Sequence, residues 1–313
     1  MRLTARIPRL LACAAVALVA ADVPLSLELL PGGRALALYP ARDRVLHYAP
    51  NNNFGPNGDY LPGRLGFNLA DVNTVDQING LEAGVKGLVW IGQCNGVDIK
   101  FLRTVQPYAR SQKLFGFYLM DDPDPRDVLA PAKLAPRCAA EDLRAESDWI
   151  HTNIPGALTL IVLMNMSSSK TPSFDGTYNP ANSHVDLFGL SPYPCRTELN
   201  GCEYEMIDRY VTAAESWGVP RSRMVPIYQA FGGGRWRDDV GGQYVLPTPD
   251  QEHQILTRWR ALVKAPVLDM AYSWGSQEAD AALESAADLK EVFSIHNKAV
   301  CQTHNPPIGS QNC

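Results

Sequence analysis

Apolar runs of strand length alternate with helix-length segments over most of the chain, from Leu65 to about His296. The runs are nearly continuous in large apolar residues, which is typical of strands buried on both faces of a parallel sheet. The predicted strands are Leu65–Ala70, Lys86–Gly92, Leu114–Met120, Leu158–Met164, Val185–Leu190, Met224–Phe231 and Leu268–Trp274. The predicted helices are Thr74–Ala83, Val97–Ser111, Ala140–Thr152, Tyr204–Trp217, Asp250–Lys264 and Ala281–His296.

This alternation predicts an α/β protein with a single (β/α)8 TIM-barrel domain over residues 65–297. Only seven strands are clear, so the eighth is either the weak segment Val45–Tyr48 or a strand in a long loop. A doubly wound open sheet is the alternative, but no GxGxxG turn follows an early strand. Residues 22–64, rich in Pro, Gly and Asn, are expected to form a lead-in, and residues 298–313 a C-terminal tail.

The first residues predict export. Three arginines precede the apolar run Leu10–Ala21, which ends in small residues suited to signal-peptidase cleavage before Asp22. We therefore expect a signal peptide over residues 1–21 and a secreted, extracellular protein. No other stretch approaches the length of a membrane span, and we expect no membrane association after the signal is removed.

Cysteine usage agrees with an oxidising compartment. Of seven cysteines, Cys13 lies in the signal, and the remaining six are an even number. No CxxC pattern argues for zinc or redox chemistry. Their spacing predicts that neighbours pair, and the predicted disulfides are Cys94–Cys138, Cys195–Cys202 and Cys301–Cys313, the last of which would close the tail.

Composition and charge narrow the possible partners. The chain has 313 residues, 46% hydrophobic and 19% charged, which is ordinary for a globular protein. A net charge of -5 without clustered Lys and Arg provides no basic field for nucleic acid, so we expect no nucleic-acid partner. Neutral substrates fit this charge better. We also expect no cofactor, no metal and a monomer.

The strand Leu114–Met120 stops abruptly in Asp121 and Asp122, and prolines follow at 123 and 125. Proline cannot donate to a strand ladder, so the acid pair must lie at the carboxyl end of the strand. Active sites of α/β barrels lie at that end. The simpler interpretation is that the acids only end the strand and cap the next helix.

Residues just past the other strands are chemically coherent with this pair. Amides, acids, hydroxyls and aromatic rings are the groups that recognise sugars, because sugar hydroxyls need planar donors and acceptors while the ring face stacks on Trp or Tyr. The strand-end residues are Asn68, Asp71, Gln93, Asn165, Ser191, Tyr193, Gln229, Trp274 and Gln277. They predict a carbohydrate partner.

Three short motifs resemble secreted bacterial glycoside-hydrolase-like TIM barrels: Gly116–Pro123 (GFYLMDDP), Val185–Pro194 (VDLFGLSPYP) and Tyr272–Gly275 (YSWG). In such proteins the first motif usually ends Asp-Glu-Pro, and its glutamate is the presumed acid/base. Asp122 holds that position here. The resemblance implies a barrel that cleaves glycosidic bonds through carboxylates.

Strand alternation favours Asp122 over Asp121 as the acid. Gly116, Tyr118 and Asp122 would share the face that looks into the barrel, whereas Asp121 would share the face under the helices. By the same argument Asp186 and Asp269 lie at strand starts and are predicted to be structural.

A glycosidase needs a second carboxylate, and the sequence does not name it. Glu278 is the first choice, and Asp71, Asp175 and the Asp238-Asp239 pair are alternatives. Trp236, which follows Gly232-Gly233-Gly234, is either a sugar-stacking flap or a side chain folded back on the rim.

The preferred hypothesis is therefore a secreted glycoside hydrolase for a neutral polysaccharide or oligosaccharide. A carbohydrate-binding barrel without catalysis is the alternative, since it would need no acid pair. Calcium binding by Asp121, Asp122 and Asp124 is a third hypothesis, although the DxDxDG pattern is absent. No GxSxG elbow points to a serine hydrolase.

Overall fold

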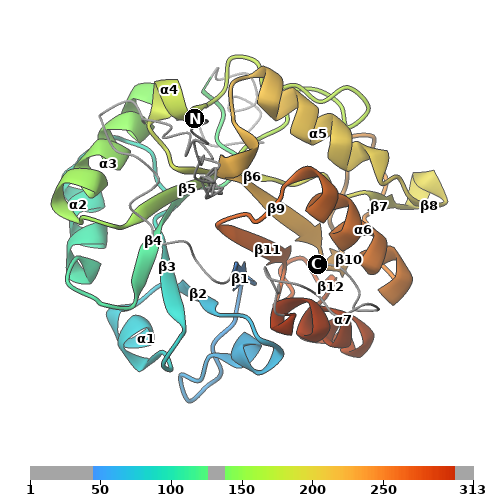
Figure 1. The fold of residues 1–313 in the computed structure, drawn as a ribbon, viewed down its shortest axis with the longest axis horizontal. Helices are drawn as coiled ribbons and strands as arrows, with labels where there is room; N and C mark the ends of the chain where they lie inside the picture. The colour runs from blue at the N-terminus through green and yellow to red at the C-terminus, as the bar shows by residue number, and fades with distance from the viewer. Residues whose placement is uncertain (1–44, 126–137, 300–313) are drawn as a thin grey trace, which may run out of the picture. The chain divides into compact units, whose positions relative to one another are not determined.

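The structure, a computed structural model, describes residues 45–125 and 138–299. Eight strands, all parallel to their neighbours, form a closed barrel, which confirms the predicted (β/α)8 fold (Figure 1). In chain order the barrel strands are β1 (Leu46–Tyr48), β2 (Leu69–Val72), β3 (Lys86–Trp90), β4 (Leu114–Met120), β5 (Leu158–Val162), β6 (Leu187–Leu190), β9 (Met224–Gln229) and β11 (Leu268–Tyr272).

Helices surround this barrel (Figure 1). The α-helices are α1 (Val75–Gly80), α2 (Ile99–Val105), α3 (Ala140–Asn153), α4 (Pro180–Ser183), α5 (Glu205–Ser216), α6 (Pro249–Leu262) and α7 (Ala287–Lys298). Short 3-10 helices are η2 (Leu61–Leu65), η3 (Gln106–Tyr108), η5 (Thr197–Leu199) and η6 (Arg221–Arg223). Two small antiparallel sheets lie outside the barrel, β7 (Cys195–Arg196) with β8 (Gly201–Cys202) and β10 (Phe231–Gly232) with β12 (Ala281–Ala282).

The missing eighth strand is the weak segment before Ala49. β1 pairs with β11 over three residues and with β2 at Tyr48, so the barrel begins before Leu65, the boundary expected from the sequence. Leu65 itself lies in η2, and the second strand starts only at Leu69. The predicted lead-in therefore contributes a strand, which was obscured because it is three residues long.

Two predicted helices are shorter than expected. α2 ends at Val105, and the chain continues as η3, because Pro107 cannot donate the hydrogen bond that an α-helix needs there. The last helix begins at Ala287, since Ala281 and Ala282 pair with β10 instead. By contrast, Thr74 caps α1 as predicted, and its side chain accepts from the Gln77 backbone.

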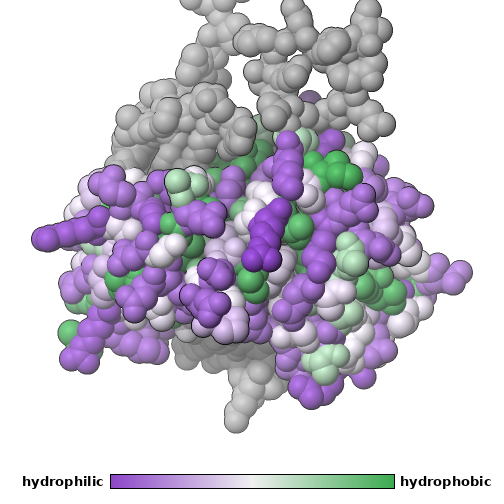
Figure 2. Space-filling view, turned by 90° about the horizontal axis from the view of Figure 1, so that it is seen from below, coloured by the Kyte–Doolittle hydropathy of each residue, from purple (hydrophilic) through white to green (hydrophobic). Residues whose placement is uncertain are grey.

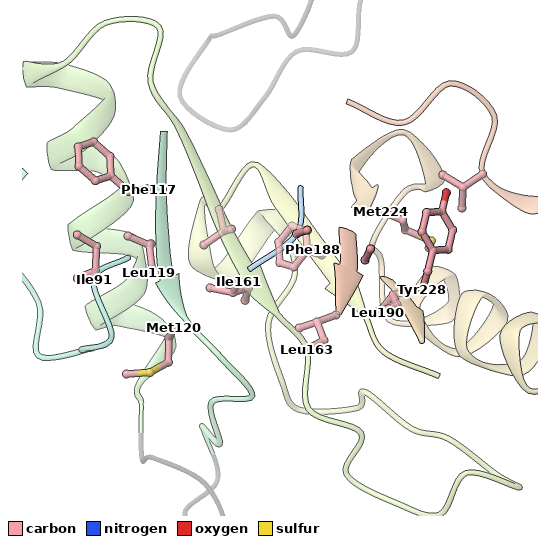
Figure 3. Packing of buried hydrophobic residues seen from close by; sticks show 14 of the residues in the cluster. Ile91, Phe117, Leu119, Met120, Ile161, Leu163, Phe188, Leu190, Met224 and Tyr228 are labelled. Carbon is pink, nitrogen blue, oxygen red and sulfur yellow. The ribbon is translucent and has the colours of Figure 1, made fainter. Parts of the chain in front are cut away.

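The main hydrophobic cluster contains buried side chains from both the strands and the helices. Figure 3 shows Phe117 and Leu119 of β4 gathered with Ile91 beside a helix. Gly116 lets β4 and β5 approach, because a Cβ there would lie 2.0 Å from the Leu158 carbonyl oxygen. Close packing of these strands therefore requires glycine at 116.

Both disulfides predicted within the described residues are confirmed, Cys94–Cys138 and Cys195–Cys202. The predicted Cys301–Cys313 pair and the signal segment lie outside the described residues. In the face shown in Figure 2, hydrophilic side chains dominate and apolar ones form small separate groups. None of the helices in residues 45–125 and 138–299 combines the length and apolar character needed to cross a membrane.

A buried carboxylate joins the two ends of the barrel sheet. Asp269 of β11 accepts from His47 Nδ1 of β1 at 2.8 Å, and its other oxygen lies 3.1 Å from His296 Nε2 of α7. Tyr228 donates to the same oxygen at 3.2 Å. Burial alone would raise the pKa of Asp269, but the two histidines lower it overall. Asp269 is thus structural, as predicted; Asp186 is too, because it is buried and binds Thr159 and His151.

We predict that Asp269→Asn destabilises the protein by about 3–5 kcal/mol at neutral pH, since breaking a buried ion pair leaves uncompensated polar groups. Because the folded-state pKa of Asp269 is depressed, its contribution is present above the unfolded pKa of about 3.9 and is lost as the pH falls toward the folded value. The difference between wild type and variant should therefore shrink in acid. Denaturant unfolding at several pH values measures it.

Asp175→Asn is the matched control, because Asp175 is exposed. An Asp269→Asn protein as stable as this control at neutral pH would contradict the assigned role.

Candidate functional site

Two neighbouring cavities lie at the carboxyl ends of the barrel strands, a region called the mouth below. The first has a volume of about 330 Å³. It is lined mainly by amides, acids and aromatic rings, namely Tyr48, Pro50, Asn51, Asn52, Asp71, Asn73, Trp90, Tyr118, Asp121, Met270, Tyr272 and Gln277.

The second cavity has a volume of about 220 Å³ and is more aromatic. Its lining consists of Tyr118, Asp121, Asp122, Val162, Ser191, Tyr193, Ile227, Phe231, Trp236, Arg237, Tyr244, Met270 and Tyr272. Four residues line both cavities: Tyr118, Asp121, Met270 and Tyr272. The cavities are therefore adjoining halves of one mouth, and Asp121 lies where they meet.

Asp121 is fixed by a short hydrogen bond. Tyr118 donates its hydroxyl to Asp121 Oδ1 at 2.6 Å, and Trp90 packs edge-on against the Tyr118 ring with centroids 4.8 Å apart. The carboxyl keeps solvent contact on one side, while the barrel wall surrounds the rest. This desolvation raises the pKa of Asp121, and the Tyr118 hydrogen bond lowers it again in part.

Asp122 shares the second cavity with Asp121 but has a different environment. Burial raises its pKa well above the usual range, and the negative charge of Asp121 raises it further. The pair thus differs in proton affinity. Asp121 ionises first, and Asp122 keeps its proton to higher pH.

The backbone explains why both acids face the mouth. The register of β4 against β5 shifts between Tyr118 and Met120, and Met120 joins Leu119 in the hydrophobic cluster. Such a bulge resets the alternation of side chains. The prediction that Asp121 faces away from the mouth is therefore wrong. Asp122 adopts φ +44°, a left-handed conformation that ends the strand.

A third carboxylate, Asp71, lies in the first cavity. It accepts from the Asn51 backbone at 3.0 Å and interacts with the Tyr48 hydroxyl. Burial raises its pKa, and these two hydrogen bonds oppose the rise. Asp71 was one of the alternatives for the second carboxylate, and among those it is the residue that lines a cavity with Asp121.

Aromatic rings form the wall of the second cavity. Tyr193 stacks on Tyr272 with centroids 5.9 Å apart and meets Phe231 and Tyr244 edge-on. Trp236 also lines this cavity, and its ring lies 6.4 Å from that of Phe231. The Trp236 ring is half-buried against the rim, and it still contributes to the cavity wall.

The mouth brings together six of the predicted site residues. They are Tyr118, Asp121, Asp122, Tyr193, Trp236 and Gln277. Gln277 Oε1 accepts from the Tyr272 hydroxyl at 2.5 Å, which places its amide beside the aromatic wall.

Six other predicted site residues do not line either cavity. They are Asn68, Gln93, Asn165, Gln229, Trp274 and Glu278. Asn68 precedes β2, at the opposite end of the barrel, and accepts from the His47 backbone. Glu278 pairs with Arg235 on the surface at 2.8 Å, so the first choice for second carboxylate was wrong.

Four of these residues serve the fold instead. Gln229 is fully buried and hydrogen-bonds both backbone groups of Cys195. Asn165 holds its own loop through the backbone groups of residues 167 and 173. Trp274 packs in the hydrophobic cluster, and Gln93 is buried. Buried amides that satisfy backbone groups have the same composition as a sugar site, so sequence alone did not separate them.

The sequence missed several lining residues because β1 was not placed. Tyr48, Asn51 and Asn52 follow from that strand, and Trp90 ends β3. The signal was the Asn-rich stretch directly after Tyr48. Its amides resemble a loop cluster until the preceding strand is placed in the barrel.

One group in residues 45–125 and 138–299 offers three metal-ligating side chains within reach of one another: His47, Asp269 and His296. Their atoms already satisfy one another by hydrogen bonds. Asp121, Asp122 and Asp124 do not form such a group, and Asp124 is fully buried while Asp121 is exposed. This arrangement gives no support to the calcium hypothesis.

No family model matches the chain, and no curated protein sequence matches it. Solved structures do. A chitinase from Bacteroides thetaiotaomicron is similar with a TM-score of 0.51 and 10% identity, over 84% of this chain and 99% of that one. A candidate α-L-fucosidase from the same species matches with a TM-score of 0.53 and 11% identity, over 82% and 94%.

A class V chitinase from Nicotiana tobaccum, solved with NAG4, has a TM-score of 0.50 and 11% identity, over 82% of this chain and 99% of that one. At such identities the likeness shows the fold alone. The chain therefore has a glycoside-hydrolase-like barrel fold.

We predict that Tyr118→Phe raises the pKa of Asp121, because the variant loses the hydroxyl that stabilises the ionised carboxylate. Carboxyl carbon chemical shifts followed over a pH titration measure this directly.

Tyr193→Phe is the control, since it removes a phenol from the same mouth and Tyr193 has no hydrogen bond to Asp121 in the described structure. An unchanged Asp121 titration in Tyr118→Phe, or an equal rise in both variants, would refute the role given to this hydrogen bond.

Proposed function

We propose that this protein is a glycoside hydrolase that cleaves a polysaccharide or oligosaccharide in the mouth of the barrel. The observation that carries the proposal is the carboxyl pair Asp121 and Asp122, whose environments separate their pKa values at the junction of two cavities. Titratable pairs separated in this way mark acid and base roles. The glycoside-hydrolase-like fold supports the same proposal.

Asp122 is the general acid in this proposal. An acid that protonates a leaving glycosidic oxygen must hold its proton near neutral pH, and an ordinary aspartate does not. Burial and the neighbouring charge of Asp121 supply the upward shift in pKa. Asp122 lines only the second cavity, so the leaving sugar occupies that cavity.

Asp121 and Asp71 then act on the sugar in the first cavity. Glycoside cleavage develops positive charge on the sugar ring, as in an oxocarbenium ion. Carboxylates that line the cavity stabilise this charge, and Asp121 lies at the junction where the bond breaks. The amides of Asn51, Asn52 and Gln277 are suited to a neutral sugar's hydroxyls.

The second cavity suits the leaving sugar because its wall is aromatic. Tyr193, Trp236 and Tyr244 offer ring faces or edges to the apolar side of a sugar. The two disulfides support the further proposal that the protein is secreted, since disulfides persist in oxidising compartments. We propose that it acts as a monomer and needs no cofactor for this carboxylate chemistry.

A carbohydrate-binding barrel without catalysis is the second candidate. It is favoured by one observation: the predicted second carboxylate, Glu278, pairs with Arg235 on the surface instead of lining the mouth. The aromatic and amide groups would bind sugar without cleaving it.

We predict that Asp122→Asn folds, binds sugar and loses at least about a hundredfold in turnover, because general acids contribute about 10²–10⁴. The assay is a panel of glucans, galactans, arabinans and chitooligosaccharides, with binding and reducing-end release measured separately. Asp175→Asn, an exposed acid outside both cavities, is the control.

Full activity in Asp122→Asn would disprove the assignment of the acid. Binding of one glycan without cleavage of any by wild type would favour the binding barrel.

A further inference from the structure

One cation lies in a mouth otherwise lined by acids, amides, aromatic rings and apolar side chains. Arg237 lines the second cavity, and no other Lys or Arg lines either cavity in the described part of the chain. Its side chain is exposed. The proposed function gives this cation no role.

The neighbouring arginines pair with acids, but Arg237 does not. Arg235 binds Glu278 at 2.8 Å, and Arg196 binds Asp239. Arg237 donates Nη1 to the backbone oxygens of Trp236 at 2.7 Å and Gly234 at 3.4 Å. No carboxylate within residues 45–125 and 138–299 pairs with it, and its Nη2 and Nε groups have no acceptor there.

These backbone bonds hold the guanidinium on the loop that carries Trp236. They occupy one nitrogen and leave the other two as donors. A guanidinium fork matches the two oxygens of a carboxylate, which makes this pairing both strong and selective.

Building on the proposed function, we propose that the second cavity binds an acidic sugar, a uronic acid, whose carboxylate pairs with Arg237. The aromatic wall takes the sugar ring, and Arg237 takes the charge at its edge. The substrate then has a neutral sugar in the first cavity and a uronic acid as the leaving group. This differs from the expectation of a wholly neutral substrate.

The distribution of acids supports this polarity. The first cavity holds Asp71 and Asp121 and no cation among its lining residues, so an anionic sugar would be repelled there. In the second cavity Asp122 keeps its proton to higher pH, which leaves Asp121 as the main negative charge opposite Arg237. The anion therefore has a favourable position in the second cavity only.

Paired ligands test the proposal by calorimetry at low salt. The probes are neutral-to-uronic-acid oligosaccharides from glucuronoxylan and pectin, each compared with its methyl ester, which keeps the ring and removes the charge. We expect wild type to bind an acid at least about tenfold more tightly than its ester, in line with charged hydrogen bonds. Arg237→Gln should reduce this ratio to about one.

Arg235→Gln is the matched control, because it removes the same charge two residues away and outside both cavities. It should keep the wild-type ratio. Equal affinity of wild type for acid and ester, absence of binding to every acid probe, or an equal loss in both arginine variants would overturn the inference. Preference for a sulfated sugar over every uronic acid would overturn the uronic-acid assignment.

Cleavage is measured separately on the same ligands. Arg237-dependent binding without cleavage would leave the inference standing while the hydrolase proposal fails. Cleavage of neutral glycans with no preference for acid over ester would have the opposite meaning.

Discussion

Closure of the barrel depends on a strand of three residues, β1, and on the carboxylate that ties it to its neighbours. So short a strand provides few ladder hydrogen bonds, and Asp269 adds side-chain bonds to His47 of β1 and His296 of α7. Because side chains alternate along a strand, His47 faces this cluster while Tyr48 faces the mouth. The seam therefore also sets the position of Tyr48 and of Asn51, whose backbone binds Asp71.

Carboxylates at the two ends of the barrel have opposite electrostatic surroundings. Asp269 is buried with two imidazoles, and its pKa falls. Asp121, Asp122 and Asp71 have hydroxyl and amide neighbours or other acids, and their pKa values rise. A group that is stabilised in its charged form contributes to the fold, whereas a group held away from its preferred ionisation is available for proton transfer. This contrast distinguishes structural from functional acids better than their sequence context does.

The sequence was informative where the local pattern and the tertiary structure coincide. β4 is a long apolar run that ends in acids and prolines, so both the strand and the mouth-facing end could be predicted. Gln229 could not be interpreted correctly, because its burial and its bonds to Cys195 depend on a loop distant in sequence. The side-chain alternation of β4 failed beyond Tyr118, since the bulge arises from pairing with β5. β1 was uncertain because three residues carry little periodicity.

The left-handed backbone at residue 122 bears on the choice of aspartate at that position. Related motifs carry glutamate there, but a positive φ is adopted more readily by Asp than by most other residues with a side chain. Aspartate is one methylene shorter, so its carboxyl must be brought to the cavity by the main chain. The bulge and the turn at φ +44° place it there, in the lining of the second cavity next to Asp121. Backbone geometry and side-chain length thus compensate each other, and the shorter acid at this position is compatible with the role of a proton donor.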